Sequence, residues 1–243
     1  MIDVIEQDGI AVFSLNRPDR GNALSSDDVA TMRDSLATLE EATGLIVIKG
    51  AGGRAFCGGI DALEIVGMDA GERQRTVGDF LDLCLEVWNH PALTIAVIDG
   101  YAVGGGAHLA LSVDLRFATA ASWFQFPAGR YGLGISAVWL GWLVGQGESL
   151  LLMSSVERIG CDRAMELGLV HRTIDDTSGD PVELLGLSSD VSHIRDVKAF
   201  VSRSIPPGLE SALLEERAWA IDAAGTAEFV EMLGRERSAR RKR

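Results

Sequence analysis

Two glycine-rich segments carry the residues whose types and spacing could do chemistry. Gly58 and Gly59 precede Ile60, and three consecutive glycines, Gly104 to Gly106, lie between an apolar run and a sequence with helical spacing of apolar residues. Glycine has no side chain and adopts unusual backbone angles, so a ligand can approach main-chain N–H groups at such a turn. If both segments offer one N–H to the same ligand oxygen, they form an oxyanion hole that stabilises negative charge on it. The alternative is a pair of tight turns that only let helices pack closely.

The elements that must position these turns alternate between strands and helices. This alternation predicts an α/β layered core, although periodicity alone does not bring the two glycine segments together in space. The sequence beyond Pro181 lacks strand patterns, which predicts a helical extension with a break at Pro206 to Gly208. The predicted strands are Ile2 to Glu6, Ile10 to Leu15, Leu45 to Lys49, Thr94 to Ile98, Leu115 to Ala118, Trp123 to Phe126 and Val170 to Ile174. Helices are predicted after Ser25 and over residues 73–88, 137–154 and 161–167, with residues 50–63 as a loop.

Composition narrows the functional classes. The chain has 243 residues, of which 47% are hydrophobic, so it can bury a large core. A net charge of −13 argues against a general nucleic-acid binder, and no apolar run approaches the roughly 20 residues of a membrane span. The first residues lack the pattern of a signal peptide. Three cysteines without a CxxC pair predict a reducing, cytoplasmic location, and four histidines without ligand spacing predict no metal site.

The last nine residues are mostly basic, although the chain as a whole is acidic. Six of them are basic, from Arg235 to Arg243. Such a terminal run is either a solvated, frayed tail or a local arm that binds phosphate groups.

Four spaced blocks resemble the crotonase superfamily, the enoyl-CoA hydratase/isomerase family, over essentially the whole chain. They are LNRPDRGNAL at 15–24, GAGGRAFCGGIDAL at 50–63, PALTIAVIDGYAVGGGAHLALSVDLRFA at 91–118 and FPAGRYGL at 126–133. The resemblance implies an α/β fold with a crotonase-like ββα spiral core over residues 1–180. It also implies a C-terminal helical trimerisation region with a basic tail over residues 181–243, and assembly as a homotrimer or hexamer.

The same resemblance implies a fatty acyl-CoA thioester as ligand, with no other cofactor. By position, the backbone N–H groups of Ile60 and Gly105 would hold the thioester carbonyl oxygen, and the basic tail could reach CoA phosphates across a subunit interface. The implied substrate-binding residues are Arg20, Ala23, Ile60, Asp61, Ala62, Leu63, Gly105, Ala128 and Tyr131.

The chain departs from the family at its acid/base positions. Hydratases of this family use two glutamates, and the matching positions hold His108 and Ala128. Hydration needs a carboxylate that activates water and returns a proton to carbon, which alanine cannot do. A third acid position used by some members falls within residues 134–139, which contain no acid. His108 is either a base that titrates near neutral pH or a structural hydrogen-bonding residue, and Tyr131 and Glu64 are further candidates.

Three functions compete on this pattern. The first is a protein that binds fatty acyl-CoA in lipid metabolism with little or no standard hydratase activity. The second is an acyl-CoA lyase or isomerase that uses Ile60, Gly105 and His108 as its catalytic groups. The third is a serine peptidase of the Clp type that shares the fold, but the nearest nucleophile turn, residues 134–138, lacks its last glycine. We therefore predict acyl-CoA binding, with the lyase or isomerase as the alternative.

Overall fold

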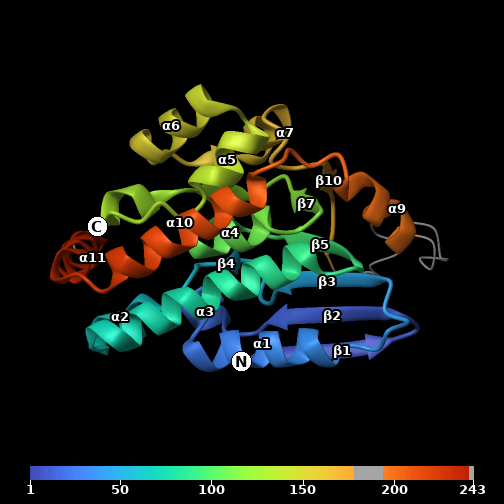
Figure 1. Cartoon of the computed structure of the whole chain (residues 1–243), viewed down its shortest axis with the longest axis horizontal. Helices are drawn as coiled ribbons and strands as arrows, with labels where there is room; N and C mark the ends of the chain where they lie inside the picture. Colours follow the sequence, from blue (N-terminus) through green and yellow to red (C-terminus); the bar gives the residue numbers. More distant parts are fainter. Residues whose placement is uncertain (178–185, 187–193, 241–243) are drawn as a thin grey trace.

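Two β-sheets frame the protein in its computed structural model, which describes residues 1–177, 186 and 194–240, the last five by backbone alone (Figure 1). The larger sheet has the strand order β1-β2-β3-β5-β7-β10. A turn at Asp8 and Gly9 makes β1 and β2 antiparallel, and every other pair in this sheet is parallel. Its strands are β1 (Ile2–Gln7), β2 (Ile10–Leu15), β3 (Leu45–Gly50), β5 (Leu93–Ile98), β7 (Leu115–Thr119) and β10 (Arg172–Ile174).

The smaller sheet has the order β4-β6-β8-β9 and is built from very short strands. They are β4 (Ala55–Cys57), β6 (Tyr101–Val103), β8 (Trp123–Gln125) and β9 (Ile159–Gly160), and the first three are mutually parallel. Each of β4, β6 and β8 follows a strand of the larger sheet, so the chain repeats a long strand, a short strand and a helical segment. This repeat confirms the predicted α/β fold with a ββα spiral.

The sequence analysis missed β4, β6 and β9 and was wrong to treat residues 50–63 as a loop, because that segment contains β4 and the start of α2 (Ala62–Gly67). Strands of two or three residues are too short to show a hydrophobic period. Residues 137–154 were predicted as one helix but form two, α5 (Ala137–Leu143) and α6 (Gln146–Ser155). Gly145 separates them with a φ of 81°, which lies outside the helical region.

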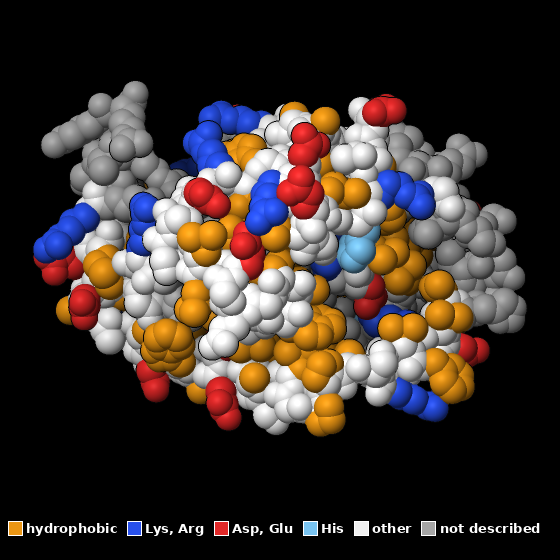
Figure 2. Space-filling view, turned by 90° about the horizontal axis from the view of Figure 1, so that it is seen from above, with side chains coloured by type: hydrophobic (Ala, Val, Ile, Leu, Met, Phe, Trp, Pro, Cys, Tyr) orange, Lys and Arg blue, Asp and Glu red, His pale blue; other side chains and the backbone are white. Residues whose placement is uncertain are grey.

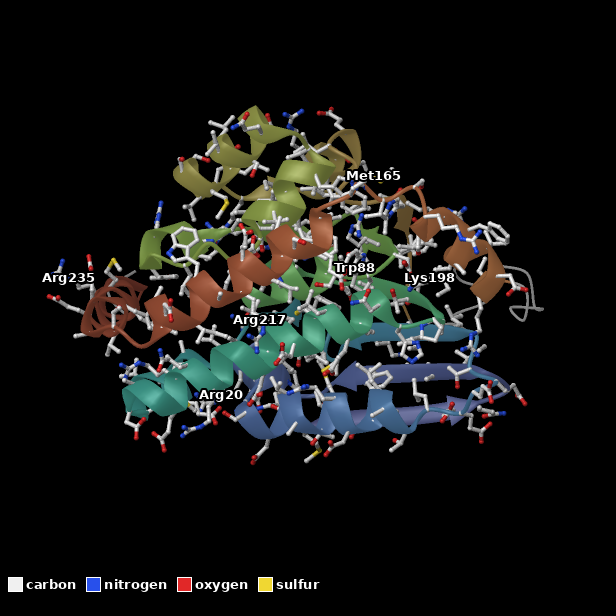
Figure 3. The ribbon with its side chains drawn as sticks, viewed as in Figure 1. Arg20, Trp88, Met165, Lys198, Arg217 and Arg235 are labelled. Carbon is white, nitrogen blue, oxygen red and sulfur yellow. The ribbon has the colours of Figure 1, made fainter. Side chains whose placement is uncertain are left out.

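Helices enclose the core that the sheets build. α1 (Ser26–Thr38) and α3 (Ala70–Asn89) each begin with a capping box, in which Ser25 pairs with Asp28 and Asp69 with Glu72. α10 (Leu209–Ala224) lies along α3, as Figure 1 shows. Arg217 of α10, labelled in Figure 3, pairs with Asp82 of α3 at 2.8 Å. The short helices are α4 (Gly105–Leu111) after β6, α7 (Cys161–Glu166) after β9, and the 3₁₀ segments η1 (Pro18–Arg20) and η2 (Pro127–Tyr131).

The C-terminal part is helical, as predicted, in the residues that the structure describes. α9 (Ile194–Ser202) and α10 are separated at Pro206 to Gly208, and α11 (Ala227–Arg240) follows α10. The predicted boundary at residue 180 and the basic side chains beyond Arg235 lie outside the described residues. Among the helices described, none is long and apolar enough to span a membrane.

The side of the molecule that carries α5, α6 and α7 exposes hydrophobic side chains between charged ones (Figure 2). Trp142 of α5 is 43% exposed, and Leu150 of α6 is 61% exposed. On α10, Trp219 is 57% exposed. An apolar surface of this kind is compatible with the assembly that the sequence resemblance implies, and the trimer or hexamer stays a prediction.

Candidate functional site

The smaller sheet places three loops side by side at the carboxyl ends of its parallel strands. β4 is followed by Gly58 and Gly59, β6 by Gly104, and β8 by Phe126 and Pro127. β4 pairs with β6 at Cys57 and Ala102, and β6 pairs with β8 over three residues. The carboxyl ends of adjacent parallel strands meet at one edge of a sheet, where α/β proteins bind ligands. The two glycine segments therefore come together because β4 and β6 are neighbours.

Gly59 and Gly105 each keep space open at a backbone nitrogen across the gap between them. A Cβ on Gly59 would lie 2.8 Å from the Gly105 nitrogen, and a Cβ on Gly105 would lie 3.3 Å from the Ile60 nitrogen. Gly59 also has a φ of +92°, which L side chains rarely adopt. The glycines at these positions thus leave the Ile60 and Gly105 nitrogens adjacent and unobstructed by side chains.

Backbone hydrogen bonds fix this geometry through the neighbours of the two groups. Leu24 N–H donates to the Gly59 carbonyl at 2.8 Å, and Asp61 N–H donates to the Leu24 carbonyl at 2.8 Å. Gly59 N–H donates to the Cys57 sulfur at 3.3 Å, and Gly104 N–H donates to the Gln125 carbonyl at 3.0 Å. In the described part of the chain, the N–H groups of Ile60 and Gly105 donate to no backbone acceptor in these turns. Both N–H groups therefore remain as donors for a ligand.

An apolar cavity of about 170 Å³ opens beside these two nitrogens. The predicted site residues Ile60, Ala62, Gly105, Ala128 and Tyr131 line it. Its remaining lining is Gly58, Gly104, Pro127, and the hydrophobic side chains Ile65, Val77, Val103, Leu133, Ile135, Phe229 and Leu233. Among these described lining residues there is no Asp, Glu, His, Lys or Arg.

A larger groove of about 1310 Å³ meets the cavity at Gly58, Ile60, Ala62, Val103 and Tyr131. The predicted residues Arg20, Ala23, Asp61 and Leu63 line this groove and not the cavity. Five arginines line it from different elements: Arg20, Arg54, Arg130, Arg158 and Arg235. Arg20 and Arg235 lie toward the same end of the molecule in Figure 3. The structure thus joins an apolar cavity to a cationic groove, with Ile60 where the two meet and Gly105 beside it in the cavity.

His108 is brought near the site but does not line the cavity or the groove. The residue is 3% exposed, and its Nδ1 lies 3.2 Å from the Ser136 hydroxyl oxygen. Burial lowers the pKa of His108 to about 3, so the ring is neutral at pH 7. A neutral imidazole makes no ion pair with the Glu216 carboxylate, whose Oε1 lies 3.8 Å from Nδ1.

Glu216 occupies the other side of Ser136. Its carboxylate accepts the Ser136 N–H at 3.0 Å and the Val138 N–H at 2.7 Å, so it caps α5 from the neighbouring α10. Burial raises the pKa of Glu216 to about 7, against these hydrogen bonds, which lower it. Glu216 and His108 together hold the residue that follows Ile135 of the cavity wall.

Arg17 is a residue that the sequence analysis did not select. Its guanidinium donates to the Ala23 carbonyl at 2.9 Å, to Asp61 Oδ2 at 3.0 Å and to Asp28 Oδ2 at 3.3 Å. Asp61 also accepts the Leu63 N–H at 3.0 Å and so caps α2. Arg17 therefore ties two groove-lining segments, at Ala23 and Asp61, to α1. The only sequence signal was its place in the block LNRPDRGNAL, next to the selected Arg20.

The profile of the enoyl-CoA hydratase/isomerase family matches residues 5–180, which include all of these loops. The chain belongs to the enoyl-CoA hydratase/isomerase family. It is 30% identical over 200 residues to the short-chain-enoyl-CoA hydratase of Clostridium acetobutylicum, covering 78% of this chain and 73% of that protein. It is also 30% identical over 189 residues to the crotonyl-CoA hydratase of Syntrophomonas wolfei, covering 74% and 69%.

Solved structures of this family share the fold. An enoyl-CoA hydratase/isomerase from Xanthobacter autotrophicus superposes with a TM-score of 0.85 at 25% identity, over 98% of this chain and 93% of that one. An enoyl-CoA hydratase from Bacillus halodurans superposes with a TM-score of 0.84 at 19% identity, over 96% and 98%. These likenesses confirm the crotonase-type fold that the four sequence blocks implied.

Proposed function

We propose that this family member binds an acyl-CoA thioester, with the thioester carbonyl oxygen accepting hydrogen bonds from Ile60 N–H and Gly105 N–H. The observation that carries the proposal is that these two donors lie next to each other in the apolar cavity, and that Ile60 also lines the arginine-rich groove. A thioester of coenzyme A has the matching order of parts: an apolar acyl chain, a polar carbonyl and an anionic nucleotide. Arginine is well suited to phosphate because its fork donates two hydrogen bonds. The proposal invokes no metal or further cofactor.

We further propose that binding occurs with little or no hydration of the acyl group. Hydration needs a group that takes a proton from water and one that returns a proton to carbon. The described lining of the cavity contains no carboxylate or imidazole. The sequence resemblance implies that Ala128 stands where family hydratases carry one of their glutamates. Asp61 lines the groove, but its carboxylate is engaged by Arg17 and by the Leu63 N–H.

The alternative, a lyase or isomerase acting through His108, has less support. The imidazole lies behind the cavity wall and faces Ser136, and its lowered pKa leaves it a weak base. We propose instead that His108 is a positioning residue. The predicted cytoplasmic location and the oligomeric state stay predictions.

Thermal unfolding with and without ligand, run beside a hydratase assay, tests the function. We expect acyl-CoA to raise Tm, and to raise it further at higher ligand concentration, because a ligand that binds only the folded state stabilises it. We expect no hydration of crotonyl-CoA even at high protein concentration. Robust hydration of crotonyl-CoA that disappears in His108→Ala would establish the alternative. Absence of any Tm shift with acyl-CoA, at concentrations up to the millimolar range, would overturn binding itself.

A further inference from the structure

We propose that the cavity selects short, unsubstituted acyl groups of about four to six carbons; this rests on the proposed thioester site. The cavity holds about 170 Å³. An apolar cavity of about 150 Å³ holds benzene, which has six carbons. Because the volume begins at the Ile60 and Gly105 nitrogens, the carbonyl carbon counts among the carbons that fit.

The lining restricts the chemistry of the acyl group as well as its length. Side chains of α2, α3, α11 and the loop after η2 face the cavity: Ile65, Val77, Phe229, Leu233, Leu133 and Ile135. Burying a hydroxyl or carboxylate against such a wall costs free energy when it finds no hydrogen-bonding partner. Tyr131 at the mouth is the one titratable side chain among the described lining residues. Acyl groups with a distal polar substituent are therefore disfavoured.

The wall that limits length is anchored to the body of the protein. Phe229, 5% exposed, lies in the first turn of α11, where its N–H donates to Thr226 Oγ1 at 3.2 Å. The corner before that turn is held by Arg73 of α3, a buried side chain. Its Nε donates to the Ala224 carbonyl at 2.9 Å, and its Nη1 donates to the Met68 carbonyl at 2.7 Å.

This anchoring makes α11 a fixed stop for the acyl chain. Met68 directly follows α2, and Ala224 is the last residue of α10, so one guanidinium joins the ends of the two elements that flank α11. A chain longer than the cavity must displace Phe229 or Leu233, which breaks packing that the Arg73 hydrogen bonds maintain. Length selection then follows from the fold and not from a specific polar contact.

Calorimetric titration of the full chain with CoA, butanoyl-CoA, hexanoyl-CoA, octanoyl-CoA and dodecanoyl-CoA tests the limit. Each methylene that the cavity buries should raise affinity about fourfold. We expect a gain of roughly fifteenfold from four to six carbons, no further gain at eight, and at least tenfold weaker binding at twelve. A steady gain through twelve carbons overturns the length limit but leaves the thioester site intact. Absence of binding for every thioester overturns the proposed function, and this inference with it.

Two variants test whether α11 sets the limit on acyl-chain length. Leu233→Ala and Phe229→Ala should move the tightest binding to eight carbons or more. The matched control is Phe200→Ala, at a side chain of α9 that is 65% exposed and lines neither cavity nor groove, and it should leave the length profile unchanged.

A substitution that makes the cavity smaller tests the same limit in the opposite direction. It is needed because Phe229→Ala removes a buried ring and can unfold the chain. Ala128→Leu adds a larger side chain to the cavity wall. It should weaken hexanoyl-CoA at least tenfold while leaving free CoA binding unchanged. An unaltered length profile in Leu233→Ala and Ala128→Leu contradicts the assignment.

Discussion

His108 and Glu216 hold the same residue from two sides: His108 Nδ1 lies 3.2 Å from the Ser136 hydroxyl oxygen, and Glu216 Oε1 accepts the Ser136 N–H at 3.0 Å. Ser136 has a φ of 79°, a strained conformation for a residue with a side chain. The adjacent Ile135 lines the acyl cavity. The two buried groups therefore support the cavity wall, and a change in the protonation of either group changes the free energy of unfolding.

The first prediction concerns acid destabilisation by His108. Burial lowers its pKa from 6.5 to about 3, so below pH 6.5 the unfolded chain binds a proton that the folded chain does not. The stabilisation is present above pH 6.5 and is lost as pH falls toward 3. In His108→Gln, the unfolding free energy should lack this slope, which is at most about 1.4 kcal/mol per pH unit. Urea unfolding from pH 4.5 to 8 measures it, and equal slopes in both proteins would refute the assignment.

Glu216 should act in the opposite direction. Its pKa is raised from 4.5 to about 7, so its contribution to stability is present below pH 4.5 and declines as pH rises to 7. Glu216→Gln keeps one acceptor oxygen and cannot ionise. Relative to the unmodified protein, its unfolding free energy should therefore rise between pH 4.5 and 7 and level off above 7. A difference that stays constant across that range would show that Glu216 is ionised in the folded chain throughout.

These buried groups mark the limit of what the sequence could predict. The four blocks and the strand periods predicted the fold class, most long strands and the paired glycine segments, because each depends on local sequence. The sequence could not place Gly59 against Gly105, since that contact depends on three-residue strands with no readable period. Nor could it show that His108 faces Ser136, because the direction of a side chain on a helix depends on tertiary packing.

A side chain at position 105 should block the two N–H groups, so Gly105→Val should weaken acyl-CoA binding. A Cβ at this position lies 3.1 Å from Phe80 Cζ and 3.3 Å from the Ile60 nitrogen, so the added methyl groups must enter the space for the thioester oxygen. We expect at least a hundredfold loss of hexanoyl-CoA affinity by calorimetry. Gly141→Val on α5 is the control, because a Cβ there meets nothing within 4 Å. If affinity survives in Gly105→Val, the ligand does not lie against these groups.

Replacing Arg17 should lower both the stability of the protein and its affinity for CoA. In Arg17→Ala, Asp61, whose side chain is 10% exposed, loses its ion-pair partner, and the Ala23 carbonyl loses a donor. We expect a cost of about 1–3 kcal/mol in urea unfolding and several-fold weaker binding of CoA. Arg33→Ala also removes an arginine with two acidic partners, Glu86 and Asp79, but on an exposed surface away from the groove. That control should cost less than about 1 kcal/mol and leave CoA binding unchanged.

Placing a carboxylate at position 128 tests whether this residue contacts the acyl chain. Ala128→Glu places an ionisable group among apolar side chains, where burial disfavours its charged form and raises its pKa. At pH 8 the ionised carboxylate opposes an apolar acyl chain, and at pH 5 the neutral acid opposes it less. Hexanoyl-CoA affinity in Ala128→Glu should therefore fall at least tenfold between pH 5 and pH 8. Ala128→Gln has nearly the same shape without the charge. Its bulk weakens binding, as in Ala128→Leu, but its affinity should change between pH 5 and pH 8 only as that of the unmodified protein does. Equal pH dependence in the two variants would mean that residue 128 contacts solvent and not the acyl chain, and would move the acyl site away from this wall.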